Sequence, residues 1–206
     1  MRLLHVSVSA RGEASHSRRV AHDLIAALHT VSPGLAVIER DLAADPVPHP
    51  DAAFVAASLT PETARDDAAR HALALSEALI DEVERADAIL ISSPMHNFTV
   101  PSALKAWLDH VVRPGRTFGL SPAGKLPLLD SRPVRAVVAC GGRFSGGPGA
   151  QTDFFSEYLC YVLGVIGLAN VDVLRLEALN RGPETVATAM EMARDWIDRQ
   201  VKSLTG

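Results

Sequence analysis

The sequence has little of what marks exported, membrane-spanning or nucleic-acid-binding proteins. Only two of its 206 residues are cysteine, Cys140 and Cys160, and they lack the paired spacing of a zinc or redox motif. No apolar run approaches the length of a membrane span, and no charged segment followed by a long apolar one opens the chain. Lysine and arginine form no cluster, and the net charge is −4. We therefore expect a cytoplasmic protein whose partners are small molecules, with no nucleic acid and no membrane among them.

Several signatures of catalysis and nucleotide binding are also absent. Neither G-x-G-x-x-G after the first predicted strand nor G-x-x-x-x-G-K-[ST] occurs, which disfavours dinucleotide binding of the Rossmann kind. There is no G-x-S-x-G, no zinc ligand set and no obvious acid–base pair. We expect no bound metal and no nucleophile supplied by the protein.

What is present is a regular alternation of strand and helix patterns. With 48% apolar residues, the chain can bury one full core, so we expect a single domain over residues 1–206. Periodicity predicts strands at 3–9, 35–40, 88–92, 134–140 and 171–176, and helices at 17–28, 61–86, 102–112, 153–167 and 183–204. The proline-rich segment 45–60 is expected to be irregular. This alternation predicts an α/β, flavodoxin-like doubly wound fold, in which a five-stranded parallel sheet has helices on both faces.

Polar or glycine-bearing segments follow three of the predicted strands. Residues 9–17 follow the first strand, 94–98 the third and 141–149 the fourth. The carboxyl ends of parallel strands meet at one edge of a sheet, and ligands bind there in open α/β folds. One pocket can therefore draw on all three segments.

The first of these segments favours an anion. Ser9, Ser15 and Ser17 stand just before a predicted helix, whose free N–H groups and positive dipole end attract phosphate. Ser15 or Ser17 alone reads better as a helix cap. The three hydroxyls together favour a phosphate.

The other two segments suit a flat aromatic ring. Gly141 and Gly142 allow the backbone to approach a ligand closely, and Met95, Asn97 and Phe98 offer main-chain hydrogen bonds and an apolar wall. Taken alone, the glycine-rich segment 141–149 reads as a flexible surface loop. The helical spacing of Trp107 and Leu108, which follow nearby, predicts core positions.

A longer motif carries a family resemblance. It consists of Pro94-Met95-His96-Asn97-Phe98, Pro101, Leu104-Lys105, Trp107, Asp109 and Arg113-x-Gly115-x-Thr117-Phe118. This motif resembles the signature of the FMN-dependent NADH-azoreductase family. The likeness extends over nearly the whole chain, including Arg40-Asp41-Leu42-Ala43, Ala72-Leu73-Ala74-Leu75-Ser76 and Tyr158-Leu159.

The resemblance implies an FMN-dependent NADH oxidoreductase that reduces quinones and azo compounds, with NADH or NADPH as donor and a homodimer as the active unit. A flavin carries such chemistry, so no catalytic side chain is required. By resemblance, the FMN phosphate is held by Ser9, Ser15, His16 and Ser17, and the isoalloxazine by Met95, His96, Asn97 and Phe98. The loop Gly141-Gly142-Arg143-Phe144 completes the predicted cofactor site.

This sequence departs from the family pattern in two places. His96 stands where the family usually has tyrosine; an imidazole can donate a proton near neutral pH, but a structural polar role is favoured. The family's Ser-Arg-Gly-Gly loop is replaced by Gly141-Gly142-Arg143-Phe144. Either the loop follows a different path, or Gly141 and Gly142 take over the close approach to the ring.

The sequence disfavours two other functions of proteins with this fold and indicates structural roles for several residues. A flavodoxin-type electron carrier shares the fold, but such carriers tend to be strongly acidic. A phosphoacceptor signalling domain needs an aspartate where Ser92-Ser93-Pro94 ends the third strand. Cys140 is expected to be a small buried hydrophobe and not a redox thiol. Apolar residues in helix 154–166, together with Phe54 and Val55, are expected to form a subunit interface.

Overall fold

The computed structural model describes residues 1–206 and is built around a parallel sheet of five strands. These are β1 (Arg2–Ser7), β2 (Ala36–Asp41), β3 (Ala88–Pro94), β6 (Val134–Ala139) and β7 (Val171–Leu176). Their order is β2-β1-β3-β6-β7, and every neighbouring pair is parallel. In this order the chain winds outward first to one side of β1 and then to the other. The predicted doubly wound sheet is confirmed.

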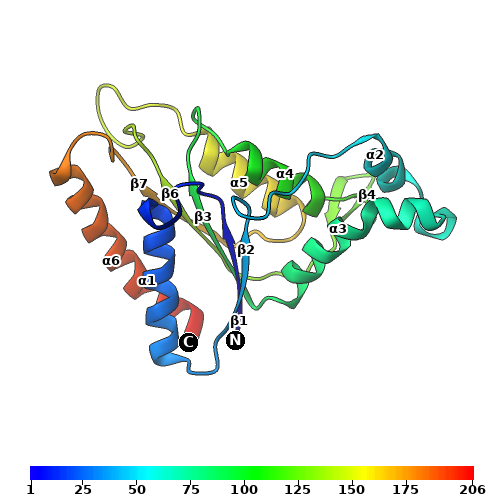
Figure 1. Cartoon of the computed structure of the whole chain (residues 1–206), viewed down its shortest axis with the longest axis horizontal. Coiled ribbons are helices and arrows are strands. Elements are labelled where there is room, and N and C mark those ends of the chain that lie inside the picture. The colour runs from blue at the N-terminus through cyan, green and yellow to red at the C-terminus, as the bar shows by residue number, and fades with distance from the viewer.

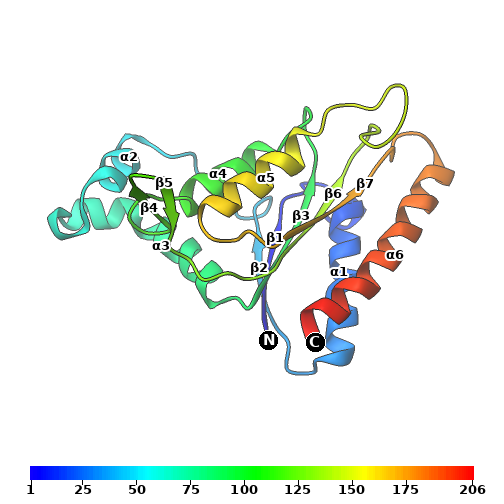
Figure 2. The same cartoon turned by 180° about the vertical axis from the view of Figure 1, so that it is seen from behind.

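Helices cover both faces of this sheet (Figures 1 and 2). On one face lie α1 (His16–Val31) and α6 (Pro183–Thr205); on the other lie α3 (Asp67–Arg85), α4 (Ser102–Val111) and α5 (Phe154–Val165). Successive side chains of a strand point to opposite faces, so β1 places Leu3 in the cluster under α1 and α6, and Leu4 in the cluster under the other helices. None of the helices is long and apolar enough to cross a bilayer.

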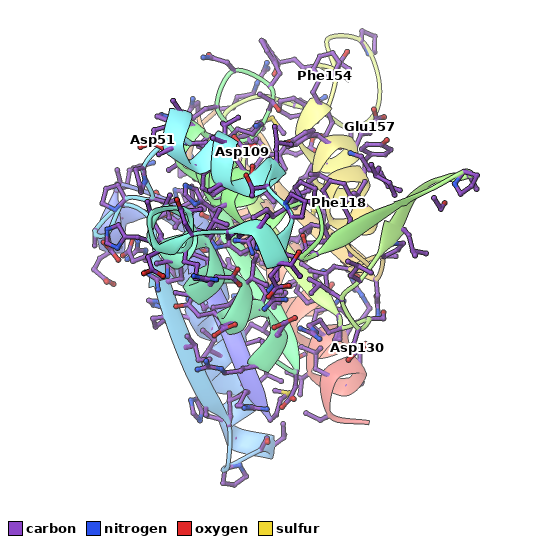
Figure 3. The ribbon with its side chains drawn as sticks, turned by 90° about the vertical axis from the view of Figure 1, so that its right-hand side faces the viewer. Asp51, Asp109, Phe118, Asp130, Phe154 and Glu157 are labelled. Atoms are coloured by element: carbon purple, nitrogen blue, oxygen red, sulfur yellow. The ribbon has the colours of Figure 1, made fainter.

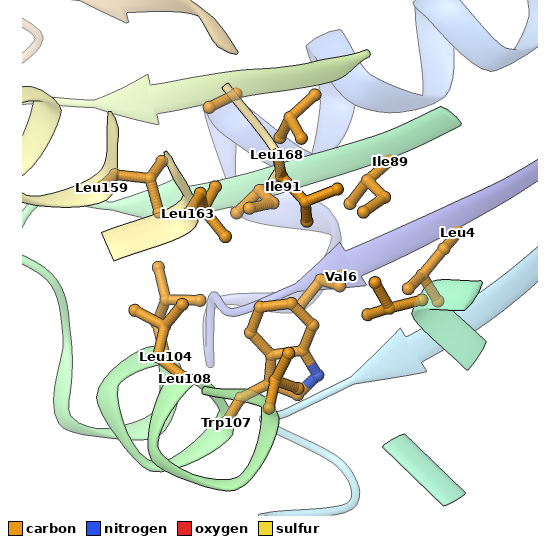
Figure 4. Packing of buried hydrophobic residues seen from close by; sticks show 14 of the residues in the cluster. Leu4, Val6, Ile89, Ile91, Leu104, Trp107, Leu108, Leu159, Leu163 and Leu168 are labelled. Carbon is orange, nitrogen blue, oxygen red and sulfur yellow. The ribbon is translucent and has the colours of Figure 1, made fainter. Parts of the chain in front are cut away.

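The larger of the two cores holds 26 buried residues and centres on α4 (Figure 4). Leu104, Trp107 and Leu108 of α4 face Val6 of β1 and Ile91 of β3 across this core. The indole of Trp107 has no solvent exposure. The core positions predicted for Trp107 and Leu108 are confirmed.

The segment 45–60 contains a helix, so the prediction that it is irregular was wrong. Asp51 accepts a hydrogen bond from the Phe54 backbone N–H at 2.8 Å and starts α2 (Ala52–Leu59). Phe54 is buried against Ala57 of the same helix and Leu73 of the neighbouring α3. The helix predicted over 61–86 likewise begins later, at Asp67, because Asp66 caps it after a separate 3-10 turn, Glu62–Ala64.

A hairpin that the sequence did not predict follows α4. Strands β4 (Phe118–Ser121) and β5 (Gly124–Pro127) pair antiparallel and project from the body of the molecule (Figure 3). The buried Arg113 anchors its start, donating to Ser76 Oγ at 2.9 Å and pairing with Glu77 on α3. The motif residue Thr117 accepts a hydrogen bond from the Arg113 N–H at 2.9 Å. Arg113 and Thr117 therefore fix the hairpin to the body.

Candidate active site

A cavity of about 220 Å³ opens where the strands of the sheet end, at the upper edge in Figure 1. It lies beside the first turn of α1, and the loops after β1, β6 and β7 contribute to it together with the last residue of β3. Its lining residues are Ser9, Arg11, Ser15, His16, Pro94, Ala139, Cys140, Gly141, Leu179 and Asn180. Of the four residues predicted to hold a phosphate, Ser9, Ser15 and His16 are among them.

Ser15 shapes the helix end of this cavity. It is the N-cap of α1, and its buried Oγ accepts a hydrogen bond from the Arg18 N–H at 3.3 Å. The hydroxyl of Ser17 lies 3.2 Å from that of Ser15 and is fully buried, so it supports Ser15 and does not line the cavity. The first N–H groups of a helix have no intrahelical partner and attract an anion.

Cations around the same helix end reinforce this preference. The pKa of His16 is lowered, by burial first and then by the positive charges of Arg19 and Arg11. Arg18 donates to the Ser9 carbonyl at 3.3 Å and pairs with Asp41 at 2.8 Å, which holds the loop after β1 against α1. Positive charge and free N–H groups thus converge on the cavity, and its chemistry suits a phosphate.

A second cavity of about 270 Å³ adjoins the first. The two share Cys140, Gly141 and Asn180 in their linings. The remaining lining residues of the second cavity are Met95, Asn97, Phe98, Gly142, Phe144 and Gln151. An anion site therefore lies next to a cavity with apolar and amide walls, which is the arrangement that a ring carrying a phosphate chain needs.

The loop after β3 forms one wall through a tight turn. The backbone of His96 and Thr99 exchanges two hydrogen bonds of 3.0 Å, and the two residues between them, Asn97 and Phe98, have positive φ of 47° and 71°. Such a φ is ordinary for asparagine in a two-residue turn but unfavourable for phenylalanine. The turn aims Asn97 and Phe98 at the cavity. The side chain of His96 is exposed and does not line it.

The loop after β6 forms the opposite wall. A side-chain carbon added at Gly141 would lie 2.4 Å from Nδ2 of Asn180, and one at Gly142 would lie 2.1 Å from Oε1 of Gln151. A larger residue at either position would displace the end of the Asn180 or the Gln151 side chain from its present place. Phe144 lines the ring-sized cavity, whereas Arg143 lines a separate cavity beside α6.

Glu177, which the sequence analysis missed, anchors this loop. Its Oε2 accepts hydrogen bonds from the N–H groups of Phe144 and Ser145 at 2.8 and 2.9 Å, and its Oε1 accepts one from Arg175 at 3.0 Å. Burial works to raise the pKa of Glu177, but these donors outweigh it and the pKa is lowered. An ionised Glu177 thus holds Phe144 at the cavity.

Arg11, Gln151, Leu179 and Asn180 are also at the two cavities and were not predicted. Asn180 lines both. The sequence could have indicated Asn180 as a site residue, because it follows the fifth predicted strand and the end of that strand lies at the same edge of the sheet. Gln151 had no such signal, since its place depends on the path of the glycine-rich loop.

Cys140 lies between the two cavities but is not poised to react. It is 1% exposed, and burial, assisted by the charges of Glu177 and Asp153, raises its pKa to about 12. A thiol with that pKa carries almost no thiolate at neutral pH.

We expect the turnover of Cys140→Ser to stay within a few-fold of wild type. The turnover of Asn97→Ala should fall below that of Cys140→Ser. Steady-state rates at matched cofactor occupancy would check this; loss of turnover in Cys140→Ser alone would indicate a thiol mechanism.

Comparison with known proteins gives consistent matches over the full length of the chain. A family model described as having a flavodoxin-like fold matches residues 1–201. An FMN-dependent NADH:quinone oxidoreductase of Cupriavidus pinatubonensis is 55% identical over 195 residues, covering 95% of each chain. One from Pseudomonas fluorescens is 41% identical, covering 96% of this chain and 94% of its own.

Solved structures show the same fold. An azoreductase of Bacillus anthracis superposes with a TM-score of 0.86 at 22% identity, covering 99% of this chain and 98% of its own. An FMN-dependent NADH-azoreductase of the same species, solved in complex with FMN, gives a TM-score of 0.85 at 18% identity, covering 97% of this chain and 99% of its own. The resemblance drawn from the motif at residues 94–118 is confirmed.

Proposed function

The chain belongs to the flavodoxin-like family that includes the FMN-dependent NADH:quinone oxidoreductases, and on this basis we propose that it binds FMN and reduces quinones and azo compounds with NADH. The observation that carries the proposal is the pair of adjoining cavities at the carboxyl edge of the sheet. One has the features of a phosphate site, and the other has the walls of a ring site.

The residues present fit FMN. The Ser9 and Ser15 hydroxyls, His16 and the first N–H groups of α1 would hold one phosphate, with Ser17 supporting Ser15. Met95, Asn97 and Phe98 on one side, and Gly141, Gly142 and Phe144 on the other, would flank the ring. No nucleotide fingerprint accompanies this phosphate site, which favours a mononucleotide over FAD.

We assign no side chain of the site a role in the redox step. When bound, FMN accepts a hydride from NADH and passes the electron pair to the acceptor. Phe98 and Phe144 give the ring site an apolar wall that limits water around a stacked substrate. Since His96 is exposed and lies outside the lining, we assign the acceptor's protons to solvent, and not to His96.

We place NADH and the acceptor in turn at the one ring site, so we expect ping-pong kinetics. NADH added without oxygen or acceptor should bleach the yellow protein, and a quinone added afterwards should restore the colour. Initial-rate plots at several acceptor concentrations should be parallel, and the same assay with NADPH gives the donor preference. A protein that NADH fails to bleach would be an electron carrier, and intersecting lines would indicate a ternary complex.

We further propose that the active unit is a homodimer of single-domain subunits. Phe154 and Tyr161 on α5 are 56% and 74% exposed, and Leu120 on the hairpin is 80% exposed; Figure 3 shows Phe154 and the hairpin on the same side. The interface cannot use Phe54, which was expected there but is buried between α2 and α3. Sedimentation should give twice the monomer mass, and Tyr161→Glu should lower it; a fully active monomer would exclude the dimer.

The cytoplasm is the compartment that we propose for this enzyme. Cys140 and Cys160 are both free thiols, as is usual for proteins of a reducing compartment.

A further inference from the structure

Two histidines and a glutamate from three different elements meet away from the flavin site. His5 lies in β1, His22 in α1 and Glu39 in β2, and His5 and Glu39 are register partners in the parallel pair. One ligand atom from each of the three lies within 4.8 Å of the others. The spacing of 5, 22 and 39 in the sequence matches no metal motif, and for that reason the sequence predicted no metal.

The ring of His5 is held in a defined orientation. It has no solvent exposure, and its Nε2 lies 2.9 Å from the Ser92 hydroxyl on β3. A partner at one ring nitrogen fixes the orientation of the other, as in metal sites where a ligating histidine has a hydrogen-bonded neighbour. The ring is thereby fixed with its Nδ1 toward Glu39.

This second nitrogen faces a carboxylate. Nδ1 of His5 is buried, and Oε2 of Glu39 lies 2.8 Å from it. An imidazole nitrogen and a carboxylate oxygen at this distance can share a proton, and they can equally share a metal ion.

We propose that His5, His22 and Glu39 bind a divalent transition-metal ion of the zinc type. Two imidazoles and a carboxylate are a common ligand set for Zn²⁺, with metal–ligand distances of roughly 2.0–2.2 Å. Ligand atoms around such an ion are about 3.3 Å apart, so the side chains of the exposed His22 and Glu39 need only a small rotation to close the site. Their exposure also gives the ion a path in and leaves a fourth position to water.

The charges nearby are compatible with this ion. The guanidinium of Arg18 is held 2.8 Å from Asp41 and is not inserted into the cluster. The bound ion would join the edge of the sheet to α1 and stabilise the fold without touching the ring cavity.

The test is Co²⁺ and Zn²⁺ binding to tag-free, FMN-loaded protein that has been treated with chelator and desalted. We expect one Co²⁺ per chain with d–d absorption beyond the flavin bands, displaced by Zn²⁺, and a Zn²⁺-dependent rise in Tm. His22→Ala and Glu39→Gln change exposed positions, so both should fold, and each should weaken Co²⁺ binding at least tenfold. His29→Ala, an exposed histidine on the same helix, is the matched control and should bind as wild type does.

Two results would overturn the site. One is no Co²⁺ bound by the wild-type protein, which would leave His5 and Glu39 as an ion pair. The other is equal binding by wild type, His22→Ala and Glu39→Gln, which would place the metal elsewhere. NADH oxidation should be the same in all these variants, so failure of the metal site is distinguishable from failure of the flavin proposal.

Discussion

Trp107→Ala is expected to cost about 3–5 kcal/mol of unfolding free energy, the usual range for removing a fully buried aromatic side chain. The fully buried indole lies between α4 and the β1–β3 part of the sheet, so its removal leaves a cavity in the core (Figure 4). For a chain of this length such a loss lowers Tm by roughly 10 °C. Thermal unfolding of the FMN-loaded variant and wild type measures it.

Trp107→Phe is the matched control. The buried indole N–H has no hydrogen-bond partner, so phenylalanine removes an unsatisfied polar group while it keeps most of the ring. We expect a loss well below that of Trp107→Ala. If the two variants were equally destabilised, the volume of the indole would not be what stabilises α4. Because the loop 94–100 leads into α4, Trp107→Ala should also weaken FMN binding.

The sheet was predictable because its strands are buried on both faces. Runs such as Ala88–Ile91 and Ala136–Val138 are apolar without interruption, as in parallel strands with helices on either side, and turn residues bound the strands that contain them. Strand β7 matches its predicted range of 171–176 exactly at both ends. The doubly wound fold followed from the alternation of strands and helices and needed no contact information.

The parts that were missed depend on tertiary contacts. Helix α2 is short and begins at an aspartate cap inside a proline-rich segment, and its one large buried side chain, Phe54, packs against α3. The hairpin β4–β5 is mostly exposed, so its strands lack the alternation of apolar and polar residues from which a strand is predicted. Its position is set by the buried Arg113, whose partners Ser76 and Glu77 lie 37 and 36 residues away in the sequence.

For the candidate site, the sequence predicted which loops meet but not which side chains turn inward. Met95, Asn97 and Phe98 line the cavity, while His96 in the same motif is exposed and lies outside the lining. Arg143 and Phe144 are adjacent and line different cavities, because Glu177 holds the Phe144 N–H. Such choices depend on backbone geometry and remote partners, which local patterns do not encode.

Ser15→Asp should lower FMN affinity by about 100-fold or more, since a carboxylate within about 4 Å of a phosphate repels it by several kcal/mol at a partly buried site. The substitution is chosen so that the fold survives it. Aspartate caps a helix as well as serine does, and its charge suits the positive end of α1. The apo protein should therefore melt at or above the wild-type temperature. Quenching of FMN fluorescence on titration with apo protein gives the dissociation constant.

Two controls, the Ser15→Asn variant and the ligand riboflavin, show whether Ser15→Asp loses FMN affinity through its charge or through a change of shape. Asparagine has nearly the same size and also caps a helix, but it carries no charge, so Ser15→Asn should lose far less FMN affinity than Ser15→Asp. Riboflavin lacks the phosphate and should bind both variants equally, because the ring cavity lined by Met95 and Phe144 is untouched. Equal loss of riboflavin and FMN in Ser15→Asp would mean that the aspartate had disturbed the ring cavity. Unchanged FMN binding would mean that the phosphate lies away from α1, and the assignment of Ser9, Ser15 and His16 would then be wrong.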